Sequence, residues 1–258
     1  MTRLLEHFRA RLNGGRKLLV PYLMAGIPEP TAYPDALRAL AEHSDAVEVG
    51  LPYSDPLMDG PVIAAAGERA LRAGMGPIDA LRETAEIRLE VPRVAMTYYN
   101  PIHRMGEQEF CTLAADAGFA GLIVPDLPVE ESEDLRGAAG DAGLAWIPLV
   151  APTSSRQRVE MITSSATGFV YAVSTLGVTG ERGSLSERAG KVVAACRAVT
   201  DLPVLVGIGV STPEQALEAT AEADGVVIGS AVVRLVLEQG AAAASAFLGT
   251  IRDTLDAV

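Results

Sequence analysis

The stretch Ala46-Val-Glu-Val-Gly-Leu-Pro-Tyr-Ser-Asp-Pro-Leu-Met-Asp-Gly-Pro-Val-Ile63 joins a strand to a helix through a proline-rich loop. The apolar run that ends at Val49 predicts the strand, and residues 62–72 predict the helix. Glu48 lies near the end of the strand, and Asp59 lies in the loop. Two carboxylates in this setting predict an acid–base pair. The alternative is a solvated strand-end glutamate beside a helix-capping aspartate.

The same alternation of strand and helix recurs along the chain. Short apolar runs predict eight strands, at 18–24, 45–49, 93–98, 120–124, 144–150, 168–173, 204–208 and 225–228. The other predicted helices span 31–43, 108–117, 130–142, 156–164, 186–199, 213–221, 231–238 and 242–255. Continuous rather than alternating apolar runs are typical of a parallel sheet that is covered on both faces.

Eight strand–helix units predict an α/β fold, a closed (β/α)₈ TIM barrel, as a single domain over residues 1–258. An extra amphipathic helix is expected at 2–12, before the first strand. An open doubly wound sheet is the structural alternative, but the first turn, Ala25-Gly-Ile-Pro28, is not a glycine-rich dinucleotide loop. The longest connections follow the second and sixth strands. The first holds Asp59, and the second holds Leu176-Gly-Val-Thr-Gly-Glu-Arg-Gly183, which we expect to be mobile.

Composition narrows the functional classes. A net charge of −12 argues against nucleic acid or an anionic membrane as a partner. No apolar run is long enough to cross a bilayer, and the N-terminus lacks the apolar core of a signal peptide. Cys111 and Cys196 both lie in helical patterns, which predicts reduced core thiols in a cytoplasmic protein.

Two glycine-containing segments follow the last two predicted strands, Val206-Gly-Ile-Gly-Val-Ser211 and Val227-Ile-Gly-Ser-Ala231. In barrels, the loops at these two places often bind phosphate through backbone N–H groups and a helix N-terminus. Gly209, Gly229 and Ser230 are the expected donors, with Gly180 completing the site. Tight turns without a ligand are the alternative.

The chain has few residues that could support Schiff-base or metal-dependent catalysis. Lys17 precedes the first strand and Lys191 lies within a helix, so a Schiff base has no evident nucleophile. The three histidines are too scattered for a metal site: His7, His43 and His103. We therefore expect no metal and no cofactor. Proton transfer by carboxylates remains, and Tyr171 either assists it or is a core aromatic residue.

The segment Glu48-Val-Gly-Leu-Pro-Tyr-Ser-Asp-Pro-Leu-Met-Asp-Gly-Pro61 resembles the signature of the tryptophan synthase alpha subunit family. Further matches are Val20-Pro-Tyr-Leu-Met-Ala-Gly26, Val124-Pro-Asp-Leu-Pro-Val-Glu-Glu131, Gly177-Val-Thr-Gly180, Gly207-Ile-Gly209 and Gly229-Ser-Ala231. The resemblance implies a (β/α)₈ barrel lyase that needs no cofactor and cleaves indole-3-glycerol phosphate to indole and glyceraldehyde 3-phosphate in tryptophan biosynthesis. It also implies a beta subunit as partner, in an α₂β₂ heterotetramer.

By this resemblance Glu48 is the general acid and base, and Asp59 binds the indole N–H. The implied neighbours are Tyr171 and Thr179, and the implied phosphate ligands are Gly180, Gly209, Gly229 and Ser230. The chemistry is consistent with these roles, because indole accepts the electrons of a retro-aldol cleavage once its C3 is protonated. Glu48, in apolar surroundings, is the better candidate for a raised pKa, while Asp59 should stay ionised. Tyr22, Met96 and Ile208 are the expected walls for the flat ring.

Some residues depart from the family pattern: Met24, Ile27, Ala64 and Ile208. None of these changes removes a proton-transfer group. Two alternatives to the alpha-subunit function stay open at this point. One is a free-standing homologue that releases indole, and the other is a non-catalytic phosphate-binding barrel, against which the retained Glu48 and Asp59 argue.

Overall fold

A computed structural model describes residues 1–173, 185–207 and 209–257 of the chain. For residues 185–188 it describes the backbone but not the side chains. Its strands form one parallel sheet with the order β5-β4-β3-β2-β1-β9-β8-β7-β6. The strands are β1 (Leu18–Met24), β2 (Val47–Gly50), β3 (Arg93–Met96), β4 (Phe119–Ile123), β5 (Ala145–Trp146), β6 (Leu149–Val150), β7 (Val170–Val173), β8 (Val204–Gly207) and β9 (Gly225–Ile228).

The sheet closes on itself because β5 and β6 are two parts of one short segment. β5 pairs with β4 and β6 pairs with β7, so the two ends of the strand order are separated only by Ile147 and Pro148. These two residues keep the ladder continuous: Ile147 N donates to Leu122 O at 3.1 Å, and Pro148 O accepts from Tyr171 N at 3.1 Å. The predicted (β/α)₈ barrel is thereby confirmed, with the strand expected at 144–150 divided in two.

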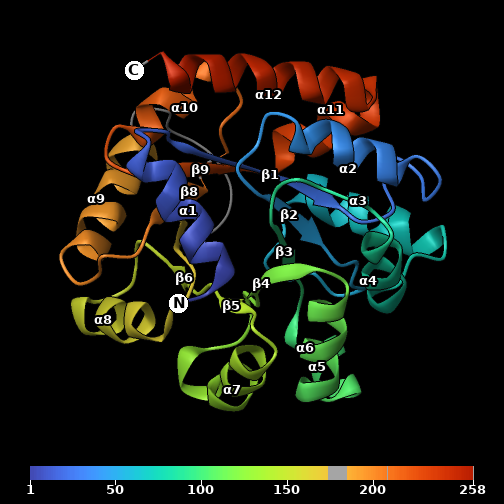
Figure 1. Ribbon diagram of the computed structural model, residues 1–258, viewed down its shortest axis with the longest axis horizontal. Coiled ribbons are helices and arrows are strands. Elements are labelled where there is room, and N and C mark those ends of the chain that lie inside the picture. The colour runs from blue at the N-terminus through green and yellow to red at the C-terminus, as the bar shows by residue number, and fades with distance from the viewer. Residues whose placement is uncertain (174–184, 208, 258) are drawn as a thin grey trace.

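The helices other than α1 surround the barrel in a ring (Figure 1). The helices are α1 (Arg3–Asn13), α2 (Tyr33–Ala41), α3 (Pro61–Arg72), α4 (Pro77–Ala85), α5 (Tyr99–Met105), α6 (Glu107–Asp116), α7 (Glu133–Asp141), α8 (Arg156–Ser165), α9 (Leu185–Arg197), α10 (Pro213–Thr220), α11 (Ser230–Gln239) and α12 (Ala241–Asp256), with a 3₁₀ turn at Val129–Glu131. The sequence analysis missed α4 and α5. Among the described residues, no helix is both long and apolar enough to cross a membrane.

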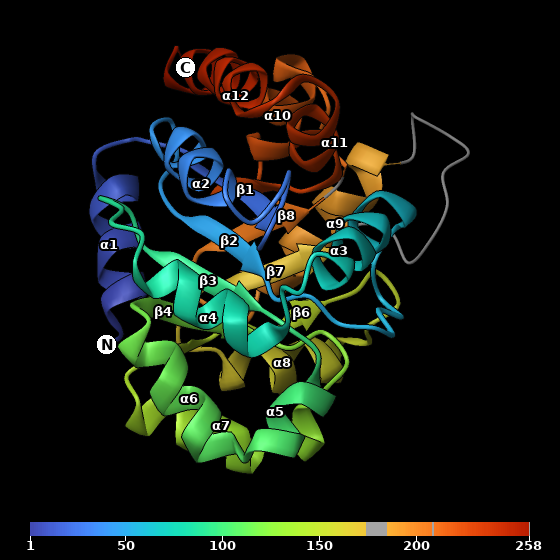
Figure 2. The same cartoon turned by 90° about the vertical axis from the view of Figure 1, so that its right-hand side faces the viewer.

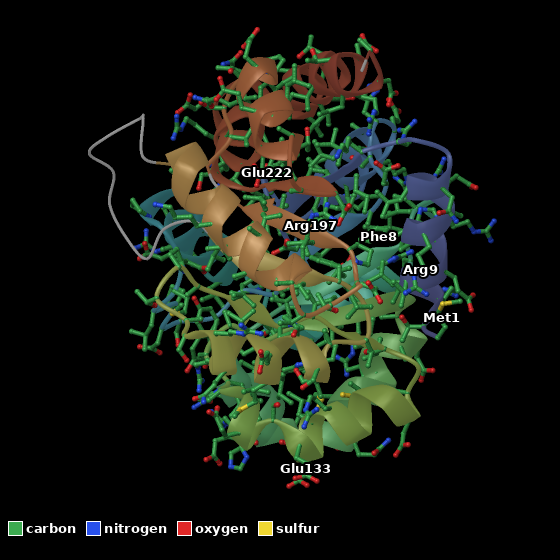
Figure 3. All side chains as sticks on the ribbon, turned by 90° about the vertical axis from the view of Figure 1, so that its left-hand side faces the viewer. Met1, Phe8, Arg9, Glu133, Arg197 and Glu222 are labelled. Atoms are coloured by element: carbon green, nitrogen blue, oxygen red, sulfur yellow. The ribbon has the colours of Figure 1, made fainter. Side chains whose placement is uncertain are left out.

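The predicted N-terminal helix α1 covers the end of the barrel at which the strands begin. In Figure 2, α1 lies at that end of the strands and α3 lies near the other. Leu4 and Phe8 of α1 are fully buried and belong to the apolar cluster that fills the barrel. The Phe8 ring, labelled on α1 in Figure 3, packs 5.6 Å from the ring of Phe169, centroid to centroid. Because this end is filled, the opposite end, where strands lead into helices, is the open mouth.

The two cysteines are buried free thiols, as the sequence predicts. Cys111 lies in α6 and Cys196 lies in α9, and both side chains are fully buried. Burial raises the pKa of Cys111 to about 12 and that of Cys196 to about 11. Both thiols are therefore uncharged at neutral pH, which makes them poor nucleophiles.

Candidate active site

Glu48 lies inside the mouth of the barrel, at the centre of β2. In the sheet it stands opposite Tyr22 of β1 and Val94 of β3. Only 2% of its surface is exposed, and no described residue hydrogen-bonds its Oε2 atom. Two causes raise the pKa of Glu48 to about 8: burial is the larger, and the charge of Asp59 is the smaller. A carboxyl group with this pKa holds its proton at neutral pH and can donate it.

Asp59 lies half-buried in the loop between β2 and α3. Burial raises its pKa to about 6, while a hydrogen bond from Tyr98 acts in the opposite direction. Asp59 is thus mostly ionised at neutral pH beside a protonated Glu48. It does not cap α3, because Gly60 holds the N-cap position and no side chain caps that helix. The helix-cap interpretation of Asp59 is therefore wrong.

Two tyrosine side chains lie close to Glu48, each packed against a glycine on a neighbouring strand. A Cβ atom on Gly50 would lie 1.9 Å from the hydroxyl oxygen of Tyr22, and one on Gly207 would lie 2.5 Å from Cε2 of Tyr171. Burial is the main cause that raises the pKa of both phenols, and the charge of Glu48 adds to it. The structure therefore brings Tyr22 and Tyr171 to the sides of Glu48.

A small cavity lies beside Asp59. Its wall includes Tyr22, Asp59 and the predicted ring contact Met96, together with Met24, Leu51, Tyr53, Pro56, Ala64, Gly67 and Tyr98. Two of the departures from the family pattern, Met24 and Ala64, are thus part of this wall. The Tyr22 hydroxyl donates to the Met24 sulfur at 3.8 Å. Ile27, a third departure, is fully buried, as an apolar side chain should be.

The expected phosphate donors lie at the ends of two neighbouring strands. Gly209 follows β8 with an exposed backbone and a φ of +68°, a conformation that favours glycine. Gly229 follows β9 and is the N-cap of α11, whose first residue is Ser230. The first hydrogen bond of this helix runs from Val233 N to Gly229 O at 3.0 Å. The N–H groups of the first turn are thus left for another acceptor, as in helix N-termini that bind anions.

Three predicted site residues lie outside the described residues: Thr179, Gly180 and Ile208. The expected mobile loop at 176–183 also lies outside them. The sequence analysis missed two aromatic residues beside Asp59, Tyr53 and Tyr98. The signal for Tyr98 was its position as the last residue of the third predicted strand, where barrel enzymes carry functional side chains.

Fold and site together define the class: a (β/α)₈ barrel enzyme with two neighbouring carboxyl groups at the mouth. Comparison with known proteins defines the family. The family model described as tryptophan synthase alpha chain matches residues 8–251. The alpha chain of Carboxydothermus hydrogenoformans is 46% identical over 239 residues, which cover 92% of this chain and 90% of that one. The alpha chain of Streptomyces avermitilis is 48% identical over 227 residues, covering 87% and 82%.

Solved structures agree with this result. A structure of Mycobacterium tuberculosis tryptophan synthase superposes with a TM-score of 0.92 at 41% identity, covering 98% of both chains. The alpha subunit of Legionella pneumophila superposes with a TM-score of 0.91 at 31% identity, covering 100% of both. The chain belongs to the tryptophan synthase alpha chain family. Membership makes it a lyase of tryptophan biosynthesis, and the comparisons favour neither the free-standing nor the non-catalytic alternative.

Proposed function

We propose that Glu48 and Asp59 carry out the cleavage of indole-3-glycerol phosphate in this protein. Protonated Glu48 donates its proton to C3 of the indole ring, which makes the ring an electron acceptor. The Asp59 carboxylate accepts the hydrogen bond of the ring nitrogen and stabilises the positive charge that develops there. Glu48, now ionised, takes the proton of the C3′ hydroxyl as the carbon–carbon bond breaks. Indole and glyceraldehyde 3-phosphate are then released.

The observation that carries this proposal is the pairing of a buried, protonated Glu48 with an ionised Asp59. The two groups have separate pKa values, about 8 and about 6, so one acid and one base coexist at neutral pH. Tyr22, Met96 and Tyr171 supply walls for the ring. Gly209, Gly229 and Ser230 are proposed to bind the phosphate through backbone N–H groups, together with Gly180. We also propose Ile208 as a further wall for the ring, and Thr179 as an active-site neighbour on the family resemblance alone.

Replacing Glu48 with glutamine tests the assignment. Glu48→Gln keeps the shape of the side chain but cannot donate or accept the catalytic proton. Indole release should fall by about 10²–10⁴-fold, the usual contribution of a general acid–base. Glu68→Gln, on the exposed surface of α3, is the matched control and should leave the rate unchanged. Near-normal turnover of Glu48→Gln would remove Glu48 from the mechanism.

The proposed partner is a tryptophan synthase beta subunit, in an α₂β₂ heterotetramer. The proposed location is the cytoplasm, which the two free thiols at Cys111 and Cys196 support, since disulfides are rare in that compartment. Adding a beta subunit should raise the rate of indole release from the isolated chain. An unchanged rate would favour an independent lyase.

A further inference from the structure

We propose that Tyr98 is a positioning residue that holds Asp59 against the indole nitrogen, with Tyr53 fixing the orientation of its ring. This inference rests on the proposed function of Asp59.

Tyr98 occupies a rigid place in the barrel. It follows β3 by two residues, is the N-cap of α5, and has only 4% of its surface exposed. Just before it, Met96 O accepts a hydrogen bond from Leu51 N at 2.9 Å, which ties the start of the β2–α3 loop to β3. Tyr98 therefore stands on the barrel wall beside the loop that carries Asp59.

The Tyr98 hydroxyl is bonded by Met58 of that loop, and the next residue, Asp59, lines the same cavity as Tyr98. The hydroxyl oxygen accepts a hydrogen bond from Met58 N at 3.0 Å. With that lone pair occupied, its hydrogen is free to donate to the Asp59 carboxylate, and this side-chain hydrogen bond lowers the pKa of Asp59. Burial and the charge of Asp59 raise the pKa of the Tyr98 phenol, so the phenol keeps its proton and stays a donor.

A second contact orients the ring of Tyr98. The Tyr53 ring stacks on it with centroids 5.2 Å apart and an angle of 29° between the planes. Tyr53 belongs to the same loop as Asp59, so Tyr98 contacts that loop at both ends. Stacked aromatic rings attract each other beyond the burial of their surface, so this contact favours one orientation of the Tyr98 ring.

The loop has other hydrogen bonds, but these fix its shape rather than its place. Leu57 N bonds Asp55 O at 2.9 Å and Asp59 N bonds Pro56 O at 3.1 Å, both within the loop. Leu57 itself is 89% exposed. A loop that is anchored this lightly needs a contact from the barrel wall to hold a carboxylate within reach of a ring nitrogen. Tyr98 supplies that contact.

The test is Tyr98→Phe, which removes the hydroxyl and keeps the stacked ring. We expect kcat for indole release to fall by about 10–100-fold, with binding of glycerol phosphate unchanged by calorimetry. The acid limb of the pH–rate profile should move to higher pH, because Asp59 loses the hydrogen bond that lowers its pKa. Tyr99→Phe is the matched control: it removes the hydroxyl of the next residue, which donates to Glu107 at 2.6 Å and does not line the cavity, and it should change neither quantity.

Two further comparisons make the outcome decisive. The double variant Tyr98→Phe with Asp59→Asn should be no slower than Asp59→Asn alone, because Tyr98 acts through Asp59. A purely structural Tyr98 would lower the melting temperature and leave the acid limb in place, which would overturn the inference. If Asp59→Asn itself turns over normally, the proposed function fails. If Asp59→Asn is slow but Tyr98→Phe has a normal rate and profile, only this inference fails.

Discussion

The hydroxyl of Tyr22 occupies the space in which a side chain at residue 50 would begin. A Cβ atom on Gly50 would lie 1.9 Å from that oxygen. Tyr22 stands opposite Glu48 in the sheet, and Gly50 stands opposite Met24, two residues further along both strands. The absence of a side chain at Gly50 thus lets a tyrosine ring lie flat across β2, directly beside the proposed acid.

Gly50→Ala should consequently displace the Tyr22 ring. We expect a loss of about 1–3 kcal/mol in the free energy of unfolding, the usual cost of overpacking a core. Indole release should fall more than glycerol phosphate binding, because the hydroxyl end of the ring is what the new methyl group displaces. Gly137→Ala is the control: nothing lies within 4 Å of its Cβ, so it should not destabilise α7. Equal stabilities of the two variants in urea would contradict this account.

Asp59→Asn keeps the size of the side chain but removes the charge beside the indole nitrogen. We expect kcat to fall by about 10²-fold or more, because one preorganised electrostatic partner contributes that much. Asp55→Asn, in an exposed part of the same loop, should have a normal rate. A normal rate for Asp59→Asn as well would assign Asp59 to loop structure.

The two raised pKa values predict a bell-shaped dependence of kcat/KM on pH. The rate should rise as Asp59 loses its proton near pH 6 and fall as Glu48 loses its own near pH 8. In Asp59→Asn the acid limb should disappear. The alkaline limb should move to lower pH, because the charge of Asp59 helps to raise the pKa of Glu48. Identical profiles for both proteins would exclude this pair.

Many strand boundaries of the barrel can be predicted from short stretches of the sequence. The strands expected at 18–24 and 225–228 have those bounds in the structure, because each is a continuous apolar run with a charged residue before it and a glycine within two residues after it. The break between β5 and β6 has a local cause as well: Pro148 has no N–H group to donate to the ladder. Because residues 144–150 form one apolar run, the sequence predicts a single strand there and does not indicate the break.

Other features depend on neighbours that the sequence does not show. Helix α4 begins with Gly76 as its N-cap and Pro77 in its first turn, but it is short and lies inside a long connection. The pairing of Glu48 with Asp59 could be predicted from the sequence, because both residues lie in one short stretch. The contact between Tyr98 and Met58 joins residues 40 positions apart and depends on how a loop folds back. Sequence periodicity carries no information about such a contact.

The raised pKa of Glu48 also predicts how stability depends on pH. Its value in the folded chain, about 8, lies above the ordinary value of 4.5, so the folded state binds the proton more tightly. The free energy of unfolding should therefore decrease as pH rises from about 4.5 to about 8. Glu48→Gln lacks this penalty and should gain on the order of a few kcal/mol over the native protein at pH 9, relative to their difference at pH 4.5. Urea unfolding at the two pH values measures it, with Glu68→Gln as a control that should show no such gain.

A negative charge at the N-terminus of α11 should separate phosphate binding from chemistry. Ser230→Asp places a negative charge where the phosphate should bind, while an acidic residue in the first turn favours the helix. Glycerol phosphate should bind at least about 10-fold more weakly, equivalent to roughly 1.4 kcal/mol. The melting temperature should not fall, so weaker binding cannot be attributed to unfolding. Gly209→Val would be a poorer test, because the φ of +68° at Gly209 strains any other residue.

Ser230→Ala is the matched control and should bind glycerol phosphate almost normally, because the proposed donors are backbone N–H groups. Glu48→Gln should behave in the opposite way to Ser230→Asp, with slow indole release and normal binding. Calorimetric titration of glycerol phosphate beside indole-release rates measures both properties in each variant. Unchanged affinity in Ser230→Asp would place the phosphate elsewhere in the mouth of the barrel and leave the role of Glu48 untouched.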